Sequence, residues 1–440
     1  MATVKPKGQL SEQEKRLGDE IEKKHGKTLE QLYQERQKRM TDAIELRVPD
    51  RVPVTLTTRG FAARYGGLTV SAMYYDQAAY RQACKKMILD FEPDICPGNF
   101  GASGLTMELL DSKTQRWPGG NLPPDVPYQF VEGEYMKAEE YDLFLSDPSD
   151  FVLRYYLPRV FGALAPLSQL PPLRTMTGGG FTALTSFFTK PEFLELADKL
   201  KKAGEAQEEQ RKAWAGFAEE MAALGFPSQQ SGRGAGGAPF DGVADQLRGL
   251  RGVMTDIYRC PDKLLAACDK ILEWRVEQSA PAGPRKGGSP KITGAPLHRG
   301  SDGFMSLKQF EKFYWPGLKK AIEINIGLGY MMSPYFEGRW NDRLEYLLEL
   351  PKGKVIASFY QTDIARAKEI MGGHMCVFAH VPGSLLQTGS TQDVEEYCKN
   401  LIKVGGKGGG FVMGALTSID EAKPANVKAM VDTVKKYGWY

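Results

Sequence analysis

The chain lacks several features that would place it in a specialised class of protein. No uninterrupted apolar run approaches the roughly 18 residues of a membrane-spanning helix. Residues 1–5 have no apolar core of the kind that a secretory signal peptide needs. Charge of one sign is not in excess either, because 57 basic residues stand against 54 acidic ones and leave a net charge of +3. We therefore expect a cytoplasmic protein that binds neither nucleic acid nor a membrane surface.

Cysteine is scarce and unpatterned. The six cysteines among 440 residues are scattered and form no C-x-x-C pair. That distribution favours reduced, mostly buried thiols over a disulfide framework. A GxxxxGK[ST] phosphate-binding loop is also absent. With 42% hydrophobic and 25% charged residues, the composition is that of an ordinary globular protein.

What the chain does contain is a rhythm of short apolar runs separated by helix-like stretches. Each run ends in glycine, proline or a polar cluster, and such alternation is typical of βα units around a parallel sheet. Eight units most simply close into a (β/α)8 TIM barrel, whose chemistry lies at the C-terminal ends of the strands. The eight expected strands are 52–58, 93–98, 172–177, 292–298, 326–333, 354–360, 376–380 and 410–414.

Residues 1–50 are predicted to form a helical extension in front of a barrel domain of residues 51–440. Ser11 with Glu14, and Thr28 with Gln31, have the spacing of capping boxes at helix N-termini. Two connections are long for a βα unit, 100–170 after strand two and 182–291 after strand three. A loop that leaves the C-terminal end of a strand lies over the barrel mouth, so the first connection is a candidate lid.

Two motifs have simpler structural explanations. Gly232-x-Gly234-x-x-Gly237 matches a dinucleotide fingerprint in its letters. It follows a helical insert and leads into a proline, so we interpret it as a loop. His374 and His380 flank a strand and would lie about 20 Å apart, which is too far for one zinc ion.

Polar side chains follow most of the expected strands. They supply acids, bases, anion-binding groups and hydrogen-bond donors that converge on one mouth in a barrel. A catalytic site at this mouth is therefore the favoured interpretation. The strand-end residues are Arg59, Arg64, Tyr65, Asn99, Thr177, His298, Arg299, Asp302, Ser333, Tyr335, Glu337, Gln361, Asp363 and His380.

Several of these stretches resemble the uroporphyrinogen decarboxylase superfamily. Arg51-Val-Pro-Val with the stretch 59–65 resembles its first strand, and the stretch 178–185 resembles its third. Within the superfamily the chain is more similar to the corrinoid-dependent methyltransferases. The stretches that carry this second resemblance are 117–119, 129–132, 298–304, 310–316, 379–386 and 422–426.

Departures from the family pattern narrow the function that the resemblance implies. Asn99 stands where the decarboxylase has the aspartate that holds the tetrapyrrole, and an amide cannot supply that charge. The family's tyrosine after strand three and histidine after strand eight have no counterpart here. The zinc His-x-Cys of the thiol-methylating members is replaced by Ser333-Pro-Tyr335, so zinc is not expected.

The resemblance therefore implies transfer of a methyl group between a small O- or N-methylated substrate and the cobalt of a corrinoid (cobalamin) on a partner protein. Asp363, Glu337, Tyr335 and His298 are the candidate catalytic set, since an acid must polarise the leaving group. The other strand-end residues and Trp117 are candidates for binding substrate or corrinoid. A decarboxylase of a carboxylate-rich substrate and a non-catalytic corrinoid- or tetrapyrrole-binding barrel stay open, as does a homodimer.

Overall fold

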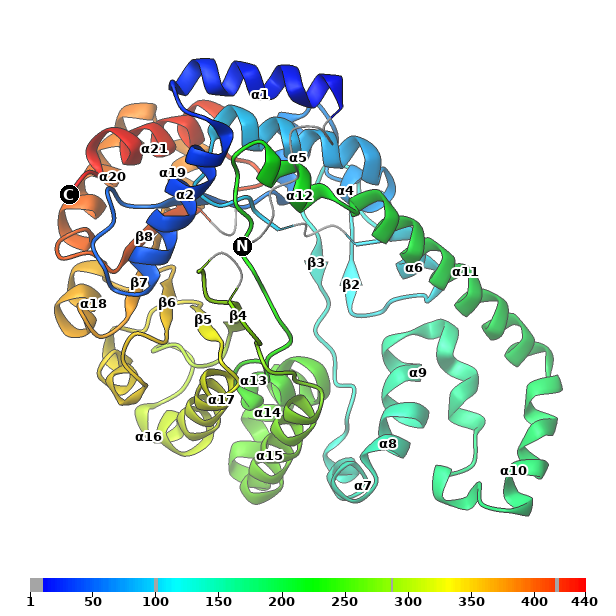
Figure 1. Cartoon of the computed structure of the whole chain (residues 1–440). Coiled ribbons are helices and arrows are strands. Elements are labelled where there is room, and N and C mark those ends of the chain that lie inside the picture. The colour runs from blue at the N-terminus through cyan, green and yellow to red at the C-terminus, as the bar shows by residue number, and fades with distance from the viewer. Residues whose placement is uncertain (1–10, 99–101, 286–287, 416–418) are drawn as a thin grey trace.

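The computed structural model describes residues 11–98, 102–285, 288–415 and 419–440. Its centre is a curled sheet of six parallel strands in the order β1-β8-β7-β6-β5-β4 (Figure 1). The predicted α/β architecture with a parallel sheet is therefore confirmed. The strands are β1 (Val54–Leu56), β4 (Ile292–Leu297), β5 (Met331–Phe336), β6 (Ile356–Phe359), β7 (Cys376–His380) and β8 (Phe411–Ala415).

Two further segments continue the sheet through single parallel bridges. Thr55 pairs with Ile95, Cys96 with Ser228, and Ser231 with Ile292. The order of segments thus runs from β1 through 95–96 and 228–231 to β4, which gives a barrel-like ring. The prediction of a strand at 172–177 is wrong, because Leu173–Thr175 is a 3-10 helix remote from the sheet. Residues 228–231 (Ser-Gln-Gln-Ser) form the third segment instead. Because their sequence is polar, no apolar run marks them as a strand.

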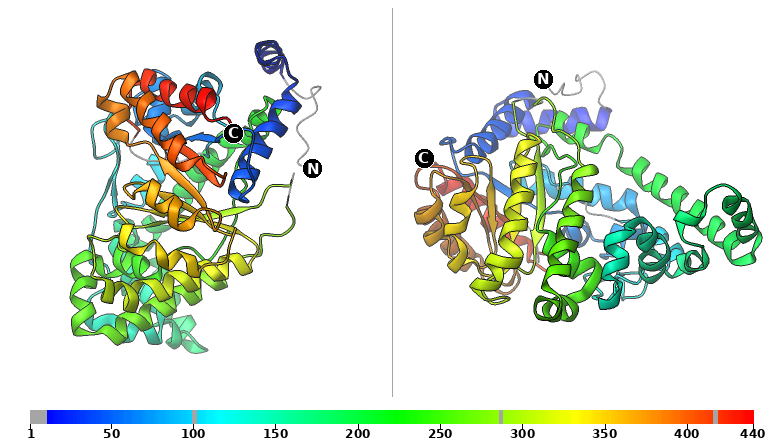
Figure 2. Two further views of the ribbon diagram at one scale, coloured as in Figure 1. Left: turned by 90° about the vertical axis from the view of Figure 1, so that its left-hand side faces the viewer. Right: turned by 90° about the horizontal axis from the view of Figure 1, so that it is seen from below.

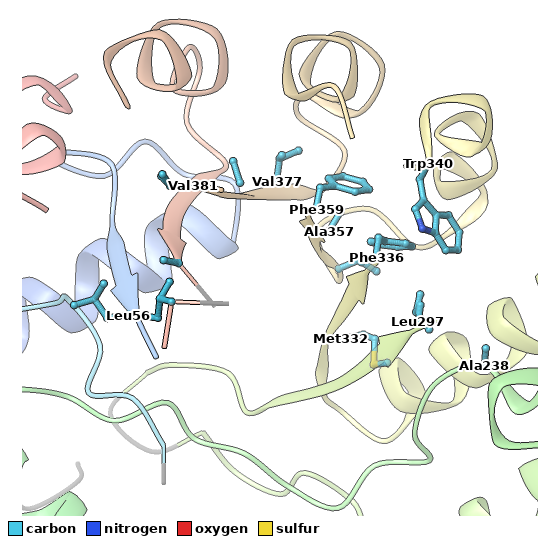
Figure 3. Packing of buried hydrophobic residues seen from close by; sticks show 14 of the residues in the cluster. Leu56, Ala238, Leu297, Met332, Phe336, Trp340, Ala357, Phe359, Val377 and Val381 are labelled. Carbon is cyan, nitrogen blue, oxygen red and sulfur yellow. The ribbon is translucent and has the colours of Figure 1, made fainter. Parts of the chain in front are cut away.

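Helices cover the outer face of the sheet. Apolar side chains on this face, including Met332, Phe336, Phe359 and Val377, pack under them in the main core (Figure 3). The longer covering helices bury apolar side chains along one face, as half-buried helices do. They are α3 (Arg59–Tyr65), α4 (Ala72–Tyr75), α5 (Gln77–Phe91), α13 (Pro239–Val243), α14 (Gly249–Arg259), α15 (Pro261–Glu277), α16 (Leu307–Gln309), α17 (Trp315–Gly327), α18 (Ile364–Met371), α19 (Gly383–Thr388), α20 (Thr391–Gly405) and α21 (Pro424–Tyr437).

The N-terminal helices close the end of the ring where the strands begin. Both predicted capping boxes are present, at Ser11 for α1 (Glu12–His25) and at Thr28 for α2 (Leu29–Ile44). From α2, Met40, Ala43 and Ile44 join a second apolar cluster inside the ring. The strands contribute Ile292, Met331, Ile356, Cys376, Phe378 and Val412 to that cluster. This end of the ring is therefore filled and apolar.

A buried ion cluster ties α2 to the first two segments of the ring. Asp94 is fully buried, and its carboxylate accepts hydrogen bonds from Arg39 at 2.6 Å and from Arg51 at 2.7 and 2.8 Å. The same carboxylate accepts the backbone N–H of Val54 at 2.8 Å. The two guanidinium groups outweigh the cost of burial and lower the pKa of Asp94 to about 2.

Residues 102–225, called the insertion below, leave the ring between its second and third segments and extend to one side (Figures 1 and 2). The sequence predicts two long connections with a strand at 172–177 between them. Within the described residues, the structure has no strand at that place. The insertion begins with α6 (Gly104–Leu109) and a hairpin of β2 (Gln115–Arg116) and β3 (Gln129–Phe130). It continues through α7 (Tyr141–Ser146), α8 (Pro148–Phe151), α9 (Leu157–Val160), α10 (Gly179–Leu184), α11 (Pro191–Trp214) and α12 (Phe217–Ala223).

The glycine-rich stretch at 232–237 is a loop, as predicted, but it follows the third segment of the ring. A side chain at Gly234 would collide with Asn325, whose amide holds Ala235 N–H and the Gly236 carbonyl. The glycines therefore allow the loop to pack closely against α17. Over the described part of the chain, no helix is both long and apolar enough to cross a membrane.

Candidate functional site

A hollow of about 650 Å³ lies at the C-terminal ends of the strands. Its wall joins loops that follow β1, β5, β6 and β8 to the hairpin of the insertion. Tyr128 and Phe130 of that hairpin are 44% and 50% exposed, so aromatic faces stand open beside the hollow. The lining residues are Arg59, Pro127, Tyr128, Phe130, Tyr335, Glu337, Gly338, Tyr360, Gln361, Gln387, Asp420 and Glu421.

His298, directly after β4, connects two carboxylates at the edge of this hollow. Its Nδ1 donates to Asp245 at 2.5 Å, and its Nε2 lies 3.8 Å from an Oε1 of Glu337. Asp245 also accepts from Arg299 Nη2 at 3.1 Å. Glu337 belongs to the wall of the hollow, so the three side chains form a row that leads from the half-buried Asp245 to the hollow.

Asp241, one helical turn before Asp245, holds the backbone of the same loop. It accepts the N–H groups of His298 and Arg299, each at 3.0 Å, and the hydroxyl of Tyr314 at 2.7 Å. Burial raises its pKa to about 6. Because residues four apart share one helix face, Asp241 and Asp245 together fix both the backbone and the imidazole orientation of His298.

The electrostatics favour protonated forms in this group. The hydrogen bond to Asp245 raises the pKa of His298, and the nearby charge of Glu337 adds to the effect. Burial raises the pKa of Glu337 itself; the charge of His298 opposes this rise, and that of Asp245 adds to it. A carboxyl with a raised pKa beside an imidazolium is suited to donate a proton.

His380, on β7, lies inside the ring near Tyr335. Its Nε2 is 2.7 Å from Ser358 Oγ, and its ring meets that of Tyr335 edge-on at 5.5 Å. The side chain is only 4% exposed, and burial lowers its pKa to about 3. His380 is therefore neutral at physiological pH, and its ring packs against that of Tyr335.

Among the other sequence-predicted residues, Arg59 and Gln361 also line the hollow. Arg59 begins α3 with a φ of 38°, a strained value for a side-chain-bearing residue. Arg299 lies behind His298, with its guanidinium 5.4 Å from the ring centre of Phe304. The structure thus brings together Arg59, His298, Arg299, Tyr335, Glu337 and Gln361.

Asp363, Ser333 and Asp302 are not brought to the hollow wall. The Asp363 carboxylate caps α18 by accepting the N–H of Arg366 at 3.1 Å. Ser333 lies lower on β5, two residues before Tyr335. Asp302 accepts from the backbone of Asp342 and lies 3.7 Å from Arg343.

Three of the remaining candidates form hydrogen bonds between segments around the hollow. Arg64 donates to Asp125 of the insertion and to the Asp420 carbonyl. Tyr65 donates to Asp90 on α5, and the buried Trp117 donates to the hydroxyl of Tyr75. Thr177 is exposed on the insertion. Asn99 falls outside the described residues.

Sequence reasoning missed Asp241, Asp245 and the carboxylates after β8, Asp420 and Glu421. Asp420 accepts the N–H of Gly60 at 3.0 Å, and burial raises its pKa. The i, i+4 spacing of Asp241 and Asp245 was a usable signal, because it places two carboxylates on one helix face. No group of three or more His, Cys, Asp or Glu side chains in the described ranges is arranged to hold a metal ion.

Together these features define a barrel-like α/β protein with an acidic, aromatic-lined hollow at the C-terminal ends of its parallel strands. The chain belongs to the uroporphyrinogen decarboxylase (URO-D) family, whose model matches residues 199–437. The fold is similar to that of a methyltransferase from Methanosarcina mazei, with a TM-score of 0.53. The two share 13% sequence identity over 91% of this chain and 98% of the other. No curated protein matches the sequence significantly.

Proposed function

We propose that the protein is a methyltransferase that moves a methyl group from a small O- or N-methylated substrate to a corrinoid on a partner protein. The observation that carries the proposal is the chain Asp245–His298–Glu337 at the edge of the hollow. We also infer that the ring is a complete (β/α)8 barrel, whose mouth is the usual place for chemistry. The methyltransferase from Methanosarcina mazei, which shares the fold, adds support.

Asp245, His298 and Glu337 together can supply the proton that methyl transfer requires. When the bond between a methyl group and oxygen or nitrogen breaks, the leaving atom gains electron density and is stabilised by a proton. Glu337 is the side chain that touches the substrate in this scheme and donates that proton. His298, charged because of Asp245, then returns a proton to Glu337. Tyr335 and Tyr360 provide apolar walls for the substrate.

The charge of the wall favours a neutral or cationic substrate. Three carboxyl side chains, Glu337, Asp420 and Glu421, face the hollow, against one guanidinium from Arg59. A substrate rich in carboxylates would find one guanidinium in this wall against three carboxyl groups, so it would lack cations to pair with. This balance favours methyl transfer over decarboxylation of a polyacid.

We infer that the corrinoid approaches from outside the hollow. A volume of about 650 Å³ is typical of a pocket for one small molecule. Each of the four histidines already has a partner: His25 with Glu92, His298 with Asp245, His374 with the Leu350 carbonyl, and His380 with Ser358. A reduced corrinoid supplies the nucleophile for the methyl group. This chain orients the donor and supplies the proton.

The test is to incubate the protein with reduced cobalamin and a panel of methyl ethers and methylated amines. Methyl transfer to cobalt changes the visible spectrum, and we expect it with at least one donor. The matched control for Glu337→Gln is Glu345→Gln. Glu345 is an exposed carboxylate that pairs with Arg366. Absence of transfer from every donor, together with CO2 release from a carboxylate substrate, would establish the decarboxylase alternative instead.

A further inference from the structure

A second hollow, of about 220 Å³, lies at the opposite end of the ring, where α1, α2 and α21 meet the starts of the first two segments. Its lining is strongly basic. Five lysine and arginine side chains and one histidine face two glutamates. The lining residues are His25, Lys27, Leu32, Glu35, Arg36, Arg39, Arg51, Glu92, Lys435 and Trp439. We call this feature the basal hollow.

The carboxylates around the basal hollow are already occupied. Asp94 binds both Arg39 and Arg51, as described above. Glu92 accepts from Lys24 at 2.8 Å and from His25 at 3.0 Å, while Lys435 lies 3.3 Å away. These cations lower the pKa of Glu92 to about 2. Glu35 accepts from Lys27 at 2.6 and 2.7 Å. Each of these three carboxylates is therefore already paired with another cation.

Arg36 is a further cation at the basal hollow. It lies on α2, is only 6% exposed, and stacks 4.0 Å above the ring of Phe226. One Nη donates to the Gly225 carbonyl at 2.6 Å. Among the described residues its guanidinium forms no ion pair within 4.0 Å. Asp94 and Glu92 attract it from farther away, and Arg39 and Arg51 repel it more weakly. These two carboxylates are shared with other cations, and the basic side chains outnumber the glutamates in the lining, so the hollow favours an added anion.

We propose that the basal hollow binds an oxyanion of the phosphate or sulfate class, held by Arg36 with help from Lys435 and Arg51. Guanidinium groups bind tetrahedral oxyanions through paired N–H donors, and the volume is large enough for such an ion. The anion would link α2 to α21 and the start of β1. This site is independent of the mouth and of the proposed methyl transfer.

The test measures thermal unfolding and titration calorimetry of the full chain in sodium phosphate, sulfate and chloride at equal ionic strength. We expect a rise in Tm that grows with the logarithm of the phosphate or sulfate concentration and reaches about 2 °C at ten times the dissociation constant, and none with chloride. Glycerol phosphate serves as a separate arm. Tighter binding than inorganic phosphate would identify a phosphomonoester as the ligand, and equal or weaker binding would identify the free ion.

Two variants decide between a specific site and a general salt effect. Arg36→Met and Lys435→Met should each weaken phosphate binding at least 10-fold. Arg211→Met, which removes an equally charged but exposed side chain on α11, should bind as the wild type does. If Arg36→Met does not fold, Lys435→Met alone gives the answer. Equal Tm in the three salts, or full retention of phosphate affinity in the folded variants, would overturn the proposal.

Discussion

At the scale of single residues, His298 has a carboxylate on each side of its ring, the half-buried Asp245 behind it and Glu337 at the hollow. This arrangement separates two tasks. Asp245 sets the charge and orientation of the imidazole, so it is a positioning residue. Glu337 lines the hollow, and in the proposed reaction it would face the substrate and donate the proton.

Glu337→Gln should lower kcat by about 100-fold or more, the usual contribution of a general acid, because an amide cannot donate a carboxyl proton. KM should change little, since the amide keeps the shape of the side chain. Initial rates of methyl transfer to reduced cobalamin measure both constants. Glu345→Gln should stay within twofold of the wild type. An unchanged kcat in Glu337→Gln would exclude Glu337 as the acid.

Asp245→Asn should move the basic limb of the pH profile of kcat/KM to lower pH. The hydrogen bond to Asp245 raises the pKa of His298, so losing the negative charge lets the imidazolium deprotonate at lower pH. Activity near pH 8 should then fall more than activity near pH 6. Asp142→Asn, which removes an exposed carboxylate paired with Lys263, is the control. A profile that keeps its position would contradict the role of Asp245.

At the scale of elements, the hairpin of the insertion is part of the hollow wall. Hydrogen bonds from Arg64 hold it next to the loop after β8. The guanidinium of Arg64 holds both Asp125 of the insertion and the loop after β8. The wall therefore depends on a contact between segments that are some 300 residues apart in the chain.

Arg64→Met should loosen this wall, raise KM several-fold and expose the chain near Asp125 to protease. The physical reason is the loss of three hydrogen bonds, two of which hold the insertion. Limited proteolysis with mass spectrometry and steady-state kinetics provide the readouts. Arg116→Met, an exposed change on the same hairpin, should alter neither. Equal proteolysis of the two variants would refute the fastening role.

At the scale of the whole molecule, the buried cluster around Asp94 ties the N-terminal helices to the ring. Asp94→Asn should lower the free energy of unfolding by about 3–5 kcal/mol, because it leaves Arg39 and Arg51 short of a counter-charge. Chemical denaturation measures the difference. Asp90→Asn, on the exposed face of α5, should cost less than about 1 kcal/mol.

The same cluster gives a pH dependence of stability. The folded pKa of Asp94, about 2, is lower than its ordinary value of 3.8. Its stabilisation is therefore present above pH 3.8 and is lost as the pH falls toward 2. The difference in unfolding free energy between wild type and Asp94→Asn should shrink over this interval in denaturation curves recorded at several pH values. A constant difference would show that Asp94 does not titrate as inferred.

The sequence alone determined much of this protein, because the information was local. Alternating apolar runs and helical stretches specified βα units, and polar residues at strand ends pointed to His298, Glu337 and Arg59. Capping boxes at Ser11 and Thr28 depend only on residues three apart, and both are present.

Only the tertiary structure decided the rest, because it depends on pairings between distant residues. The third segment of the ring, 228–231, is polar and is defined by its bridges to Cys96 and Ile292, whereas the apolar run 172–177 packs elsewhere. Asp363 was predicted to be an acid, yet one of its oxygens caps the first turn of α18 and the residue does not line the hollow. Asp245 reaches His298 across 53 residues of sequence, and no local pattern encodes that contact.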